Sequence, residues 1–415
     1  MSENGNVSGS SFFDRPNVEK DTIQVAGGIP FGIETVINQS LGIGGAYCSW
    51  GASYSNAQLP AFVSMRLGET LADSDVMNLA DLGFVSRHHI PDLSDEDHLE
   101  LELEVGTRLL KAAILANNWA AGEVDAVLIG TSAPVSLNFV EEISRRAGIR
   151  SDALFVSVHK ACDGSMGALQ LALNTGVEMP VHGNIASQLV GKKVLVGGIE
   201  GLSRFTCHAR DKNALQLFGN GAGVIGVIPG TTMKLLVGKS TENFDVEGLL
   251  QVRMYYPHSR VISTGKSLLE VYSESNNHIR IAGMMHEPAD GLPIVMAGLM
   301  GMVKLFVRSG VEVVTDVFRE YTALMAQSDT PKKKIDIGIA HHANYKINLL
   351  KAKQLAKEGV EFPMPWLLND FGNVSAASCM IAFLRQLPKI EPGMHVMFDG
   401  FGAGTYYDVM AVSMG

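Results

Sequence analysis

The chain contains few cysteines, and their spacing does not pair them. Its four cysteines, Cys48, Cys162, Cys207 and Cys379, are scattered over 415 residues without a CxxC pair. Such spacing excludes the disulfide framework of a small secreted domain. It is typical of a protein from a reducing compartment, and we therefore expect a cytoplasmic protein.

Long hydrophobic runs and an excess of positive charge are also missing. The longest apolar stretch, residues 292–303, is too short to span a bilayer and contains Pro293. Residues 1–21 are polar and lack the basic-then-apolar order of a secretory signal. The formal net charge of −10 argues against nucleic acid as the main partner. We expect a soluble intracellular protein with no membrane span and no nucleic-acid partner.

The sequence does contain enough apolar residues for a large core. Hydrophobic residues make up 46% of the chain, and its length predicts two or three domain-sized units. Buried-strand patterns alternate with helical patterns, which predicts a mainly parallel α/β fold. In the first half we predict strands over 41–47, 124–131 and 193–198, helices over 99–117 and 141–147, and a hairpin with a glycine corner over 215–228.

The second half of the chain repeats the order of the first. Residues 335–341 parallel the strand at 124–131, and residues 395–400 parallel the strand at 193–198. We infer a duplication about a pseudo-two-fold axis, with the break near 229–235. The chain is thereby divided into an N-terminal extension over 1–40, expected to be partly disordered, a first half over 41–232 and a second half over 233–415.

Cys162 stands where a buried strand gives way to a buried helix, within residues 154–173. Free amides and the positive end of the helix dipole at such a junction favour a thiolate over a thiol. We expect the neighbouring His159 and Lys160 to lower the pKa of the thiol further. This stretch alone leaves two interpretations open, a nucleophile or a small buried hydrophobe.

The duplication is expected to place polar partners opposite Cys162. The turn with Asn373 matches the turn with Cys162, and His341 follows a strand that ends at the same edge of the fold. A cysteine with histidine and asparagine partners suits attack on a thioester carbonyl. The adjacent His341 and His342 also fit a metal pair or two structural residues. Because no carboxylate or cysteine stands beside them at ligand spacing, we expect no metal.

Five short motifs occur in one order between about residue 41 and the C-terminus. They are ACDGSMGA at 161–168, FGNGAG at 218–223, HHANYKI at 341–347, FGNVSAAS at 371–378 and GFGAG at 400–404. Together they resemble the ketoacyl-ACP synthase III family of the thiolase superfamily. The resemblance implies a thiolase fold, a duplicated five-layered αβαβα architecture with pseudo-two-fold symmetry.

The resemblance also implies roles for individual residues. Cys162 would take an acyl group from a coenzyme A thioester, and His341 with Asn373 would promote decarboxylation of malonyl-ACP. The amides of Cys162 and Ala403 would hold the oxyanion of acyl transfer. The remaining substrate-binding candidates are Asn344 beside a phosphopantetheine arm, Lys346 and Arg204 for a phosphate or an acidic carrier protein, and Gly402 in the glycine corner. A solvated surface charge is an equal alternative for Lys346.

No cofactor and no metal is implied by the resemblance, because CoA or phosphopantetheine thioesters are the substrates. The partners it implies are acyl-CoA and malonyl-CoA or malonyl-ACP, an acyl carrier protein as a candidate, and a second copy of the chain in a homodimer.

Several features depart from the family pattern. Residues 81–87 lack the usual Arg-Thr-Gly-Ile, so a CoA donor would bind differently or the acyl group would arrive on a carrier protein. Extra segments at 181–189 and 360–366 would reshape the acyl tunnel or the dimer surface. The methionine-rich segments 284–285 and 296–302 are interpreted as core packing or as the lining of a wide acyl pocket, and we favour packing.

Glu141 and Glu142 follow a loop that in relatives reaches the partner subunit's active site. In olefin-forming acyl-CoA condensing enzymes, a glutamate of this region serves as a base. Here we favour a charged helix start, since acids are stabilised at that position in any case.

The leading hypothesis is an acyltransferase that forms a carbon–carbon bond by decarboxylative Claisen condensation. A Cys-bound acyl group would react with a malonyl thioester in fatty-acid or specialised lipid or polyketide synthesis. Alternatives are non-decarboxylating head-to-head condensation of two acyl-CoAs, acyl transfer to another nucleophile, and a non-catalytic acyl-binding subunit. Retention of Cys162, His341 and Asn373 disfavours the last.

Overall fold

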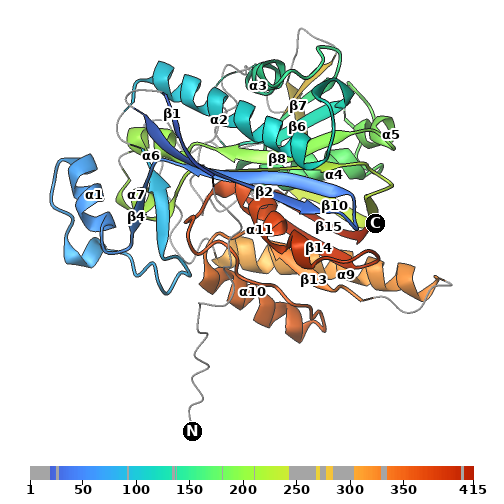
Figure 1. Ribbon diagram of the computed structural model, residues 1–415. Helices are drawn as coiled ribbons and strands as arrows, with labels where there is room; N and C mark the ends of the chain where they lie inside the picture. The colour runs from blue at the N-terminus through green and yellow to red at the C-terminus, as the bar shows by residue number, and fades with distance from the viewer. Residues whose placement is uncertain are drawn as a thin grey trace.

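Two β-sheets alternate with three layers of helices (Figure 1). The computed structural model describes residues 19–24, 28–90, 93–132, 136, 138–179, 181–209, 211–242, 268–271, 277–283, 303–328, 334–402 and 406–415. From the top of Figure 1 downward, an outer helical layer covers the first sheet, a central helical layer separates the sheets, and a second outer layer covers the other sheet. The outer helices are α2 (Asp95–Ala116) and α3 (Phe139–Ala147), the central ones α4 (Gly164–Leu173) and α11 (Ser378–Gln386), and the lower ones α9 (Gly310–Ala326) and α10 (Tyr345–Lys357).

Among the described residues the first sheet has nine strands, in the order β1-β2-β3-β9-β8-β6-β7-β12-β11. They are β1 (Glu19–Ile23), β2 (Ile29–Asn38), β3 (Ile43–Trp50), β9 (Gly221–Val227), β8 (Val194–Glu200), β6 (Ala126–Gly130), β7 (Leu154–His159), β12 (His278–Gly283) and β11 (Leu268–Val271). The second sheet follows the order β10-β15-β14-β13, formed by β10 (Met233–Glu242), β15 (Tyr406–Met414), β14 (His395–Gly402) and β13 (Ile337–Ala340).

A smaller group of helices and strands lies at the left of Figure 1. There β4 pairs antiparallel with β5, and α1 packs with α7 around a separate apolar cluster. These elements are β4 (Ala52–Ser55), β5 (Ser86–His89), α1 (Leu59–Leu67) and α7 (Lys212–Leu217), with α6 (Leu202–Ala209) nearby in sequence. The remaining short elements are α5 (Ile185–Leu189), the 3₁₀ turns Asp73–Asp75, Ala121–Glu123 and Leu387–Lys389, and a π-helical turn, Val303–Ser309, before α9.

Two sequence expectations about the sheets are wrong. Parallel pairing is confined to β8-β6-β7-β12 and to β13-β14, and the other described pairs are antiparallel. Strands such as β15 return beside their predecessor without a helical crossover, which makes them antiparallel. Residues 215–228 are not a hairpin either. Asp211 caps the short helix α7 by accepting from the amides of Asn213 and Ala214, and β9 then pairs with both β8 and β3.

The described strands before residue 40, β1 and β2, extend the first sheet. β2 pairs antiparallel with β3, and β1 pairs antiparallel with β2. At the end of β2, the Asn38 side chain donates to the carbonyls of Leu387 at 2.8 Å and Ile390 at 2.7 Å. These buried hydrogen bonds tie the added strands to the C-terminal half.

The two halves repeat the same local contacts, in keeping with the duplication inferred from sequence. Before β6, the Asp125 carboxylate accepts from the Lys193 amide at 2.9 Å. Before β13, the Asp336 carboxylate accepts from the His395 amide at 2.8 Å. These equivalent bonds align β6 with β8 and β13 with β14 at the same relative positions.

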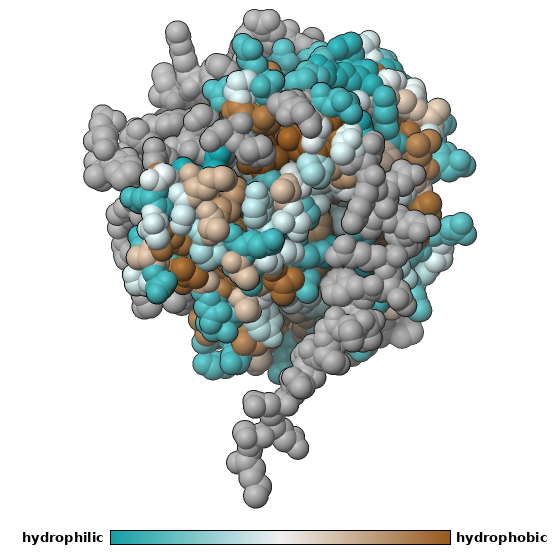
Figure 2. Space-filling model, turned by 60° about the vertical axis from the view of Figure 1, so that its left-hand side comes forward, coloured by the Kyte–Doolittle hydropathy of each residue, from teal (hydrophilic) through white to brown (hydrophobic). Residues whose placement is uncertain are grey.

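Among the described helices, none is both long enough and apolar enough to cross a bilayer. Figure 2 shows apolar side chains in small areas between polar ones, with a larger apolar area near the top of that view.

The central helices pack very closely on the sheets. Every residue of α4 is buried, and a Cβ built on Gly130 of β6 would lie 2.0 Å from the carbonyl carbon of Gly164. That contact is with backbone, which has no flexible end to move aside. Gly130 is therefore required by packing.

We expect Gly130→Ala to lower the free energy of unfolding by about 1–3 kcal/mol, the usual cost of overpacking a core. Urea denaturation would measure it. Gly122→Ala is the matched control, because no atom lies within 4 Å of a Cβ there, and its stability should stay within about 0.5 kcal/mol of the parent. Equal stability of both variants would show that the sheet and helix are less tightly apposed.

Candidate active site

Cys162 lies in a tight turn between β7 and α4. The turn is the 3₁₀ segment Ala161–Asp163, and Ala161 adopts the left-handed conformation with φ of 49°. This conformation is costly for a residue with a side chain and is typical of functional sites. Gly402 of β14 packs against the turn, since a Cβ there would lie 3.0 Å from the Cys162 amide nitrogen. The predicted junction of strand and helix is confirmed, and it holds the sulfur directly before the helix.

A matching turn in the second half places Ser375 against the cysteine and fixes the side chain of Asn373. Its 3₁₀ segment is Ser375–Ala377, and Ser375 has φ of 44°, close to that of Ala161. The Ser375 hydroxyl donates to the Cys162 sulfur at 3.2 Å. The Ser375 amide donates to Oδ1 of Asn373 at 2.9 Å. Because its oxygen is engaged, the Asn373 side chain is held with its NH₂ group as the part that can donate to a ligand.

His341 follows β13 and is held by the same second-half turn region. Its amide donates to the Asp399 carbonyl at 3.0 Å, and its Nδ1 is hydrogen-bonded to the hydroxyl of Ser378, the first residue of α11. The Phe401 ring meets the imidazole edge-on at 5.0 Å. Burial, with smaller effects of His342 and Lys351, lowers the pKa of His341 to about 3. The imidazole is therefore neutral, and when the Ser378 hydroxyl donates to Nδ1, Nε2 carries the proton.

The second histidine of the pair is structural. Nδ1 of His342 donates to the Ala340 carbonyl at 2.8 Å, and Nε2 accepts from the Leu367 amide at 2.9 Å. Burial lowers the pKa of His342 to about 4, so the ring stays neutral. Within the described ranges no group of histidines, cysteines and acids has an arrangement that could hold a metal ion.

The other predicted binding residues have structural partners. Oδ1 of Asn344 caps α10 by accepting from the Ile347 amide at 2.9 Å. Lys346 forms an exposed ion pair with Asp81 at 3.1 Å. Gly402 is brought against the nucleophile turn, as described above, while Ala403 lies outside the described residues.

Arg204 does not present a free cation to a ligand. Its Nε lies 3.2 Å from Oε1 of Glu102, a carboxylate that is almost fully buried. Burial raises the pKa of Glu102, and the arginine opposes that shift. We therefore assign Arg204 to this internal pair; a role in phosphate binding stays a prediction without support from these contacts.

The basic neighbours of Cys162 do not act as the sequence predicted. Burial lowers the pKa of His159 to about 4, so this residue is neutral. The Lys160 ammonium is buried and forms an ion pair with Asp408, with a carboxylate oxygen of Asp163 3.9 Å away. Burial and the charge of Asp408 raise the pKa of Asp163 well above its usual range. The positive charge of Lys160 is thus compensated by Asp408, a residue of β15 that sequence reasoning did not assign to it.

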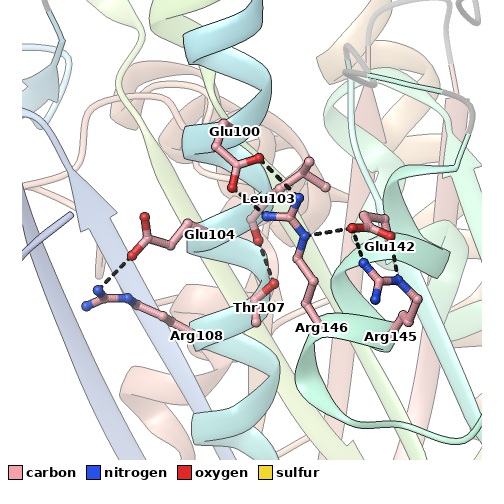
Figure 3. A network of polar contacts seen from close by, with 8 residues as sticks. All are labelled: Glu100, Leu103, Glu104, Thr107, Arg108, Glu142, Arg145 and Arg146. Atoms are coloured by element: carbon pink, nitrogen blue, oxygen red, sulfur yellow. Dashed lines mark hydrogen bonds and ion pairs between the residues drawn. The ribbon is translucent and has the colours of Figure 1, made fainter. Parts of the chain in front are cut away.

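Glu142 belongs to an ion-pair network between α2 and α3 (Figure 3). Its carboxylate accepts from Arg145 and Arg146, both at 2.7 Å, and Arg146 also reaches Glu100 at 2.5 Å. These two arginines lower the pKa of Glu142 to about 2, which makes it a poor base. Glu141 lies 3.3 Å from Nδ1 of His278. Both acids stand in the first turn of α3, in agreement with the favoured interpretation as a charged helix start.

The methionine-rich segments at 284–285 and 296–302 lie outside the described residues. Of the two extra segments, 181–189 contains the short helix α5, and 360–366 ends at Trp366. The Trp366 indole donates to the Gly83 carbonyl at 2.7 Å, which attaches this segment to the stretch where the family motif was missing.

Glu200 is a site residue that the sequence did not reveal. It ends β8, at the position that matches Gly402 of β14, and it is 1% exposed. Oε1 accepts from the amides of Ser132 at 2.6 Å and Ala376 at 3.1 Å, and Oε2 lies 2.8 Å from the Ser132 hydroxyl. Ala376 matches Cys162 in the duplicated turn. The carboxyl group of Glu200 thus covers the second-half amide, whereas Gly402 has no side chain that would reach the amide of Cys162.

The comparisons with known proteins agree with this geometry. Residues 325–414 match the family described as 3-Oxoacyl-[acyl-carrier-protein (ACP)] synthase III C terminal. The chain is 26% identical over 314 residues to the beta-ketoacyl-[acyl-carrier-protein] synthase III (KAS III) of Psychromonas ingrahamii, covering 75% of this chain and 83% of that protein. It is 27% identical over 349 residues to the protein of the same name from Streptococcus mutans, covering 82% and 93%. The chain is thus an enzyme similar to KAS III condensing enzymes.

Solved structures share the fold of this KAS III-like enzyme. The synthase III from Thermus thermophilus aligns with a TM-score of 0.60 at 18% identity, covering 92% of this chain and 98% of that one. An OleA variant from Xanthomonas campestris aligns with a TM-score of 0.57 at 12% identity, covering 91% and 96%. The thiolase fold with helices between and outside two sheets, expected from the sequence, is confirmed.

The buried Glu200 of this KAS III-like enzyme predicts a pH dependence of stability. Burial raises its pKa to about 8, above the usual 4.5. Between about pH 4.5 and about pH 8 the unfolded chain loses this proton while the folded protein retains it. The free energy of unfolding therefore falls as the pH rises through that range. In Glu200→Gln, Oε1 still accepts both amides and the NH₂ group donates to Ser132, without a titrating proton.

We therefore expect the urea midpoint of the parent protein to fall, relative to that of Glu200→Gln, between about pH 4.5 and about pH 8. The exposed acid Glu69 provides the control, since Glu69→Gln should follow the parent at both pH values. Parallel pH profiles of the parent and Glu200→Gln would contradict the buried proton.

Proposed function

We propose that this enzyme forms a carbon–carbon bond by decarboxylative Claisen condensation of a Cys162-bound acyl group with a malonyl thioester. The observation that carries the proposal is the linked arrangement of the three predicted residues. The Cys162 sulfur is hydrogen-bonded to the turn that fixes Asn373, and a neutral His341 is bonded to the helix that follows that turn. The similarity to KAS III enzymes supports the same reaction class.

In the first half-reaction the Cys162 thiolate attacks the carbonyl carbon of an acyl thioester. The carbonyl electron pair moves to oxygen, and collapse of the tetrahedral intermediate expels the thiolate of the carrier. The amide of Cys162 is proposed to hold the oxyanion together with that of Ala403. Small residues suit this place, because any side chain at position 402 would contact the Cys162 amide.

In the second half-reaction a malonyl thioester loses carbon dioxide. The electron pair of the broken carbon–carbon bond forms an enolate on the thioester oxygen, which the Nε2–H of His341 and the NH₂ group of Asn373 stabilise. The enolate carbon then attacks the acyl group on Cys162 and releases the cysteine thiolate. A histidine with its pKa lowered to about 3 suits this task, because it donates a hydrogen bond without carrying charge.

The substrates are proposed to reach the site as thioesters of CoA or of an acyl carrier protein. Asn344 and Lys346 begin α10, directly after His341, and are proposed to lie beside the entering phosphopantetheine arm. We further propose a cytoplasmic homodimer without a bound cofactor, acting in fatty-acid or specialised lipid or polyketide synthesis. Condensation of two acyl-CoAs without decarboxylation is the second candidate, and the low pKa of Glu142 argues against that residue as its base.

Intact-protein mass spectrometry with a panel of acyl-CoAs tests the first half-reaction. We expect a mass increase equal to the acyl group in the parent protein and none in Cys162→Ala. If no CoA donor loads the parent, acyl-ACPs should be offered next, as the altered 81–87 stretch would require. Failure of both donor classes would overturn the proposal.

Addition of malonyl-CoA or malonyl-ACP to the loaded enzyme tests the second half-reaction. We expect carbon dioxide release and loss of the acyl adduct, both reduced by about 10²-fold or more in His341→Ala and Asn373→Ala, because each removes a donor to the enolate. Both variants should still form the acyl adduct. Condensation of two acyl-CoAs without carbon dioxide release would instead establish the second candidate function.

A further inference from the structure

Ser375 contacts the Cys162 sulfur, and sequence reasoning gave it no role although it lies within the FGNVSAAS motif at 371–378. Its hydroxyl oxygen lies 3.2 Å from the Cys162 sulfur, and the residue is only 2% exposed. The two residues are 213 positions apart in the chain. The contact therefore exists only because the two halves place their equivalent turns against each other.

The backbone of the turn fixes the direction of this hydroxyl. Ser375 is held in the left-handed region, and its amide donates to Asn373. Ala161 occupies the matching position of the first-half turn with nearly the same φ but has no hydroxyl. The left-handed position thus carries a hydroxyl donor in the second-half turn, which is the turn that faces Cys162.

The chemistry of sulfur explains what such a donor would do. The thiolate, not the thiol, is the nucleophile. A hydrogen bond to a charged acceptor is roughly twice as strong as a bond to a neutral one. A hydroxyl at hydrogen-bond distance from sulfur therefore favours the charged form.

We propose that Ser375 is a catalytic residue whose hydroxyl donates a hydrogen bond to the Cys162 thiolate and stabilises it as nucleophile. This role deepens the proposed function, since it assigns a thiolate-stabilising group to the first half-reaction. The same bond stabilises the thiolate when condensation expels it from the acyl intermediate. While the sulfur is acylated it is a neutral, weak acceptor, and the hydroxyl then contributes little to it.

The charged groups packed around the turns do not replace this donor. On the first-half side, Lys160 is paired with Asp408, and His159 is neutral because burial lowers its pKa to about 4. Burial and the charge of Asp408 raise the pKa of Asp163 well above its usual range.

The second-half side is balanced in the same way. His341 is neutral, with its pKa lowered to about 3, and Lys351 is paired with Asp399 at 2.6 Å. Glu200, which accepts from the Ala376 amide of the Ser375 turn, has its pKa raised to about 8. A neutral hydroxyl donor is thus a fitting way to stabilise negative charge on the sulfur.

The test measures the pH dependence of Cys162 alkylation by iodoacetamide in the full-length protein, followed on the Cys162 peptide by mass spectrometry. Ser375→Ala removes the hydroxyl and keeps the left-handed strain. Ser375→Gly removes the hydroxyl and relieves the strain, because glycine accepts this φ freely. Ser165→Ala is the matched control, since it removes an equally buried hydroxyl from α4 that has no hydrogen-bond partner.

We expect both Ser375 variants to raise the apparent pKa of Cys162 by about one unit, which slows alkylation about tenfold at a pH below that pKa. Ser165→Ala should keep the parent profile. Parent-like profiles in both Ser375 variants would overturn the proposal. A shift that occurs in Ser375→Ala but not in Ser375→Gly would also overturn it, because backbone strain would then be the cause of the shift. If the alanine variant does not fold, the glycine variant decides alone: a raised pKa supports the proposal and a parent-like profile overturns it.

Alkylation requires no acyl donor, so this result is independent of the proposed reaction. A shifted alkylation profile in a protein that accepts no acyl thioester would uphold the role of Ser375 and reject the proposed function. A parent-like profile in a protein that condenses normally would do the reverse.

Discussion

The contact between the two equivalent turns is the constraint on which the rest of the structure depends. A Cβ on Gly164 would lie 3.1 Å from the Cβ of Ala376, and a Cβ on Gly198 would lie 2.6 Å from the Ala376 carbonyl oxygen. Only small residues allow this approach. Because the turns meet, Ser375 reaches Cys162, Asn373 is fixed beside it, and the ends of β8 and β14 cover the turns from either side. The sheets and outer helices serve to hold this arrangement.

Burial of the turns sets the electrostatics of the site. Charges taken out of water are costly unless they are paired, so ionisable groups here are either neutral or matched. His341 and His342 are neutral, while Lys160 and Lys351 are each paired with an aspartate. A site of this kind suits a reaction that develops negative charge on sulfur and then on oxygen, since neutral donors stabilise both without adding a fixed charge.

The two equivalent turns differ in the residue that packs against them. The turn at Cys162 faces Gly402, which has no side chain, and the turn at Ala376 binds the carboxyl group of Glu200. The Ala376 amide thus donates to the side chain of Glu200, whereas the corresponding amide of Cys162 lies beside Gly402. The same turn geometry thus has a side-chain acid beside it in one half and a glycine in the other.

Local sequence patterns determined most of the elements and pointed to Cys162, His341 and Asn373 as candidate site residues. The stretch around Cys162 predicted a buried strand followed by a buried helix, and the repeated order of strands predicted the duplicated fold. Patterns within a few residues were sufficient there, because helix, strand and turn formation depend on neighbouring side chains. The same patterns misjudged the strand directions, since direction depends on whether a connection crosses over the sheet.

Only the tertiary structure decided which groups act together. The sequence placed Lys160 beside Cys162, but Asp408 on another strand compensates its charge. It offered Arg204 as a phosphate ligand, yet that side chain is paired with Glu102. Neither Ser375 as a donor to the sulfur nor Glu200 as a buried acid was apparent. Charge state and hydrogen bonding depend on burial and on partners far away in the chain, and only folding brings these into contact.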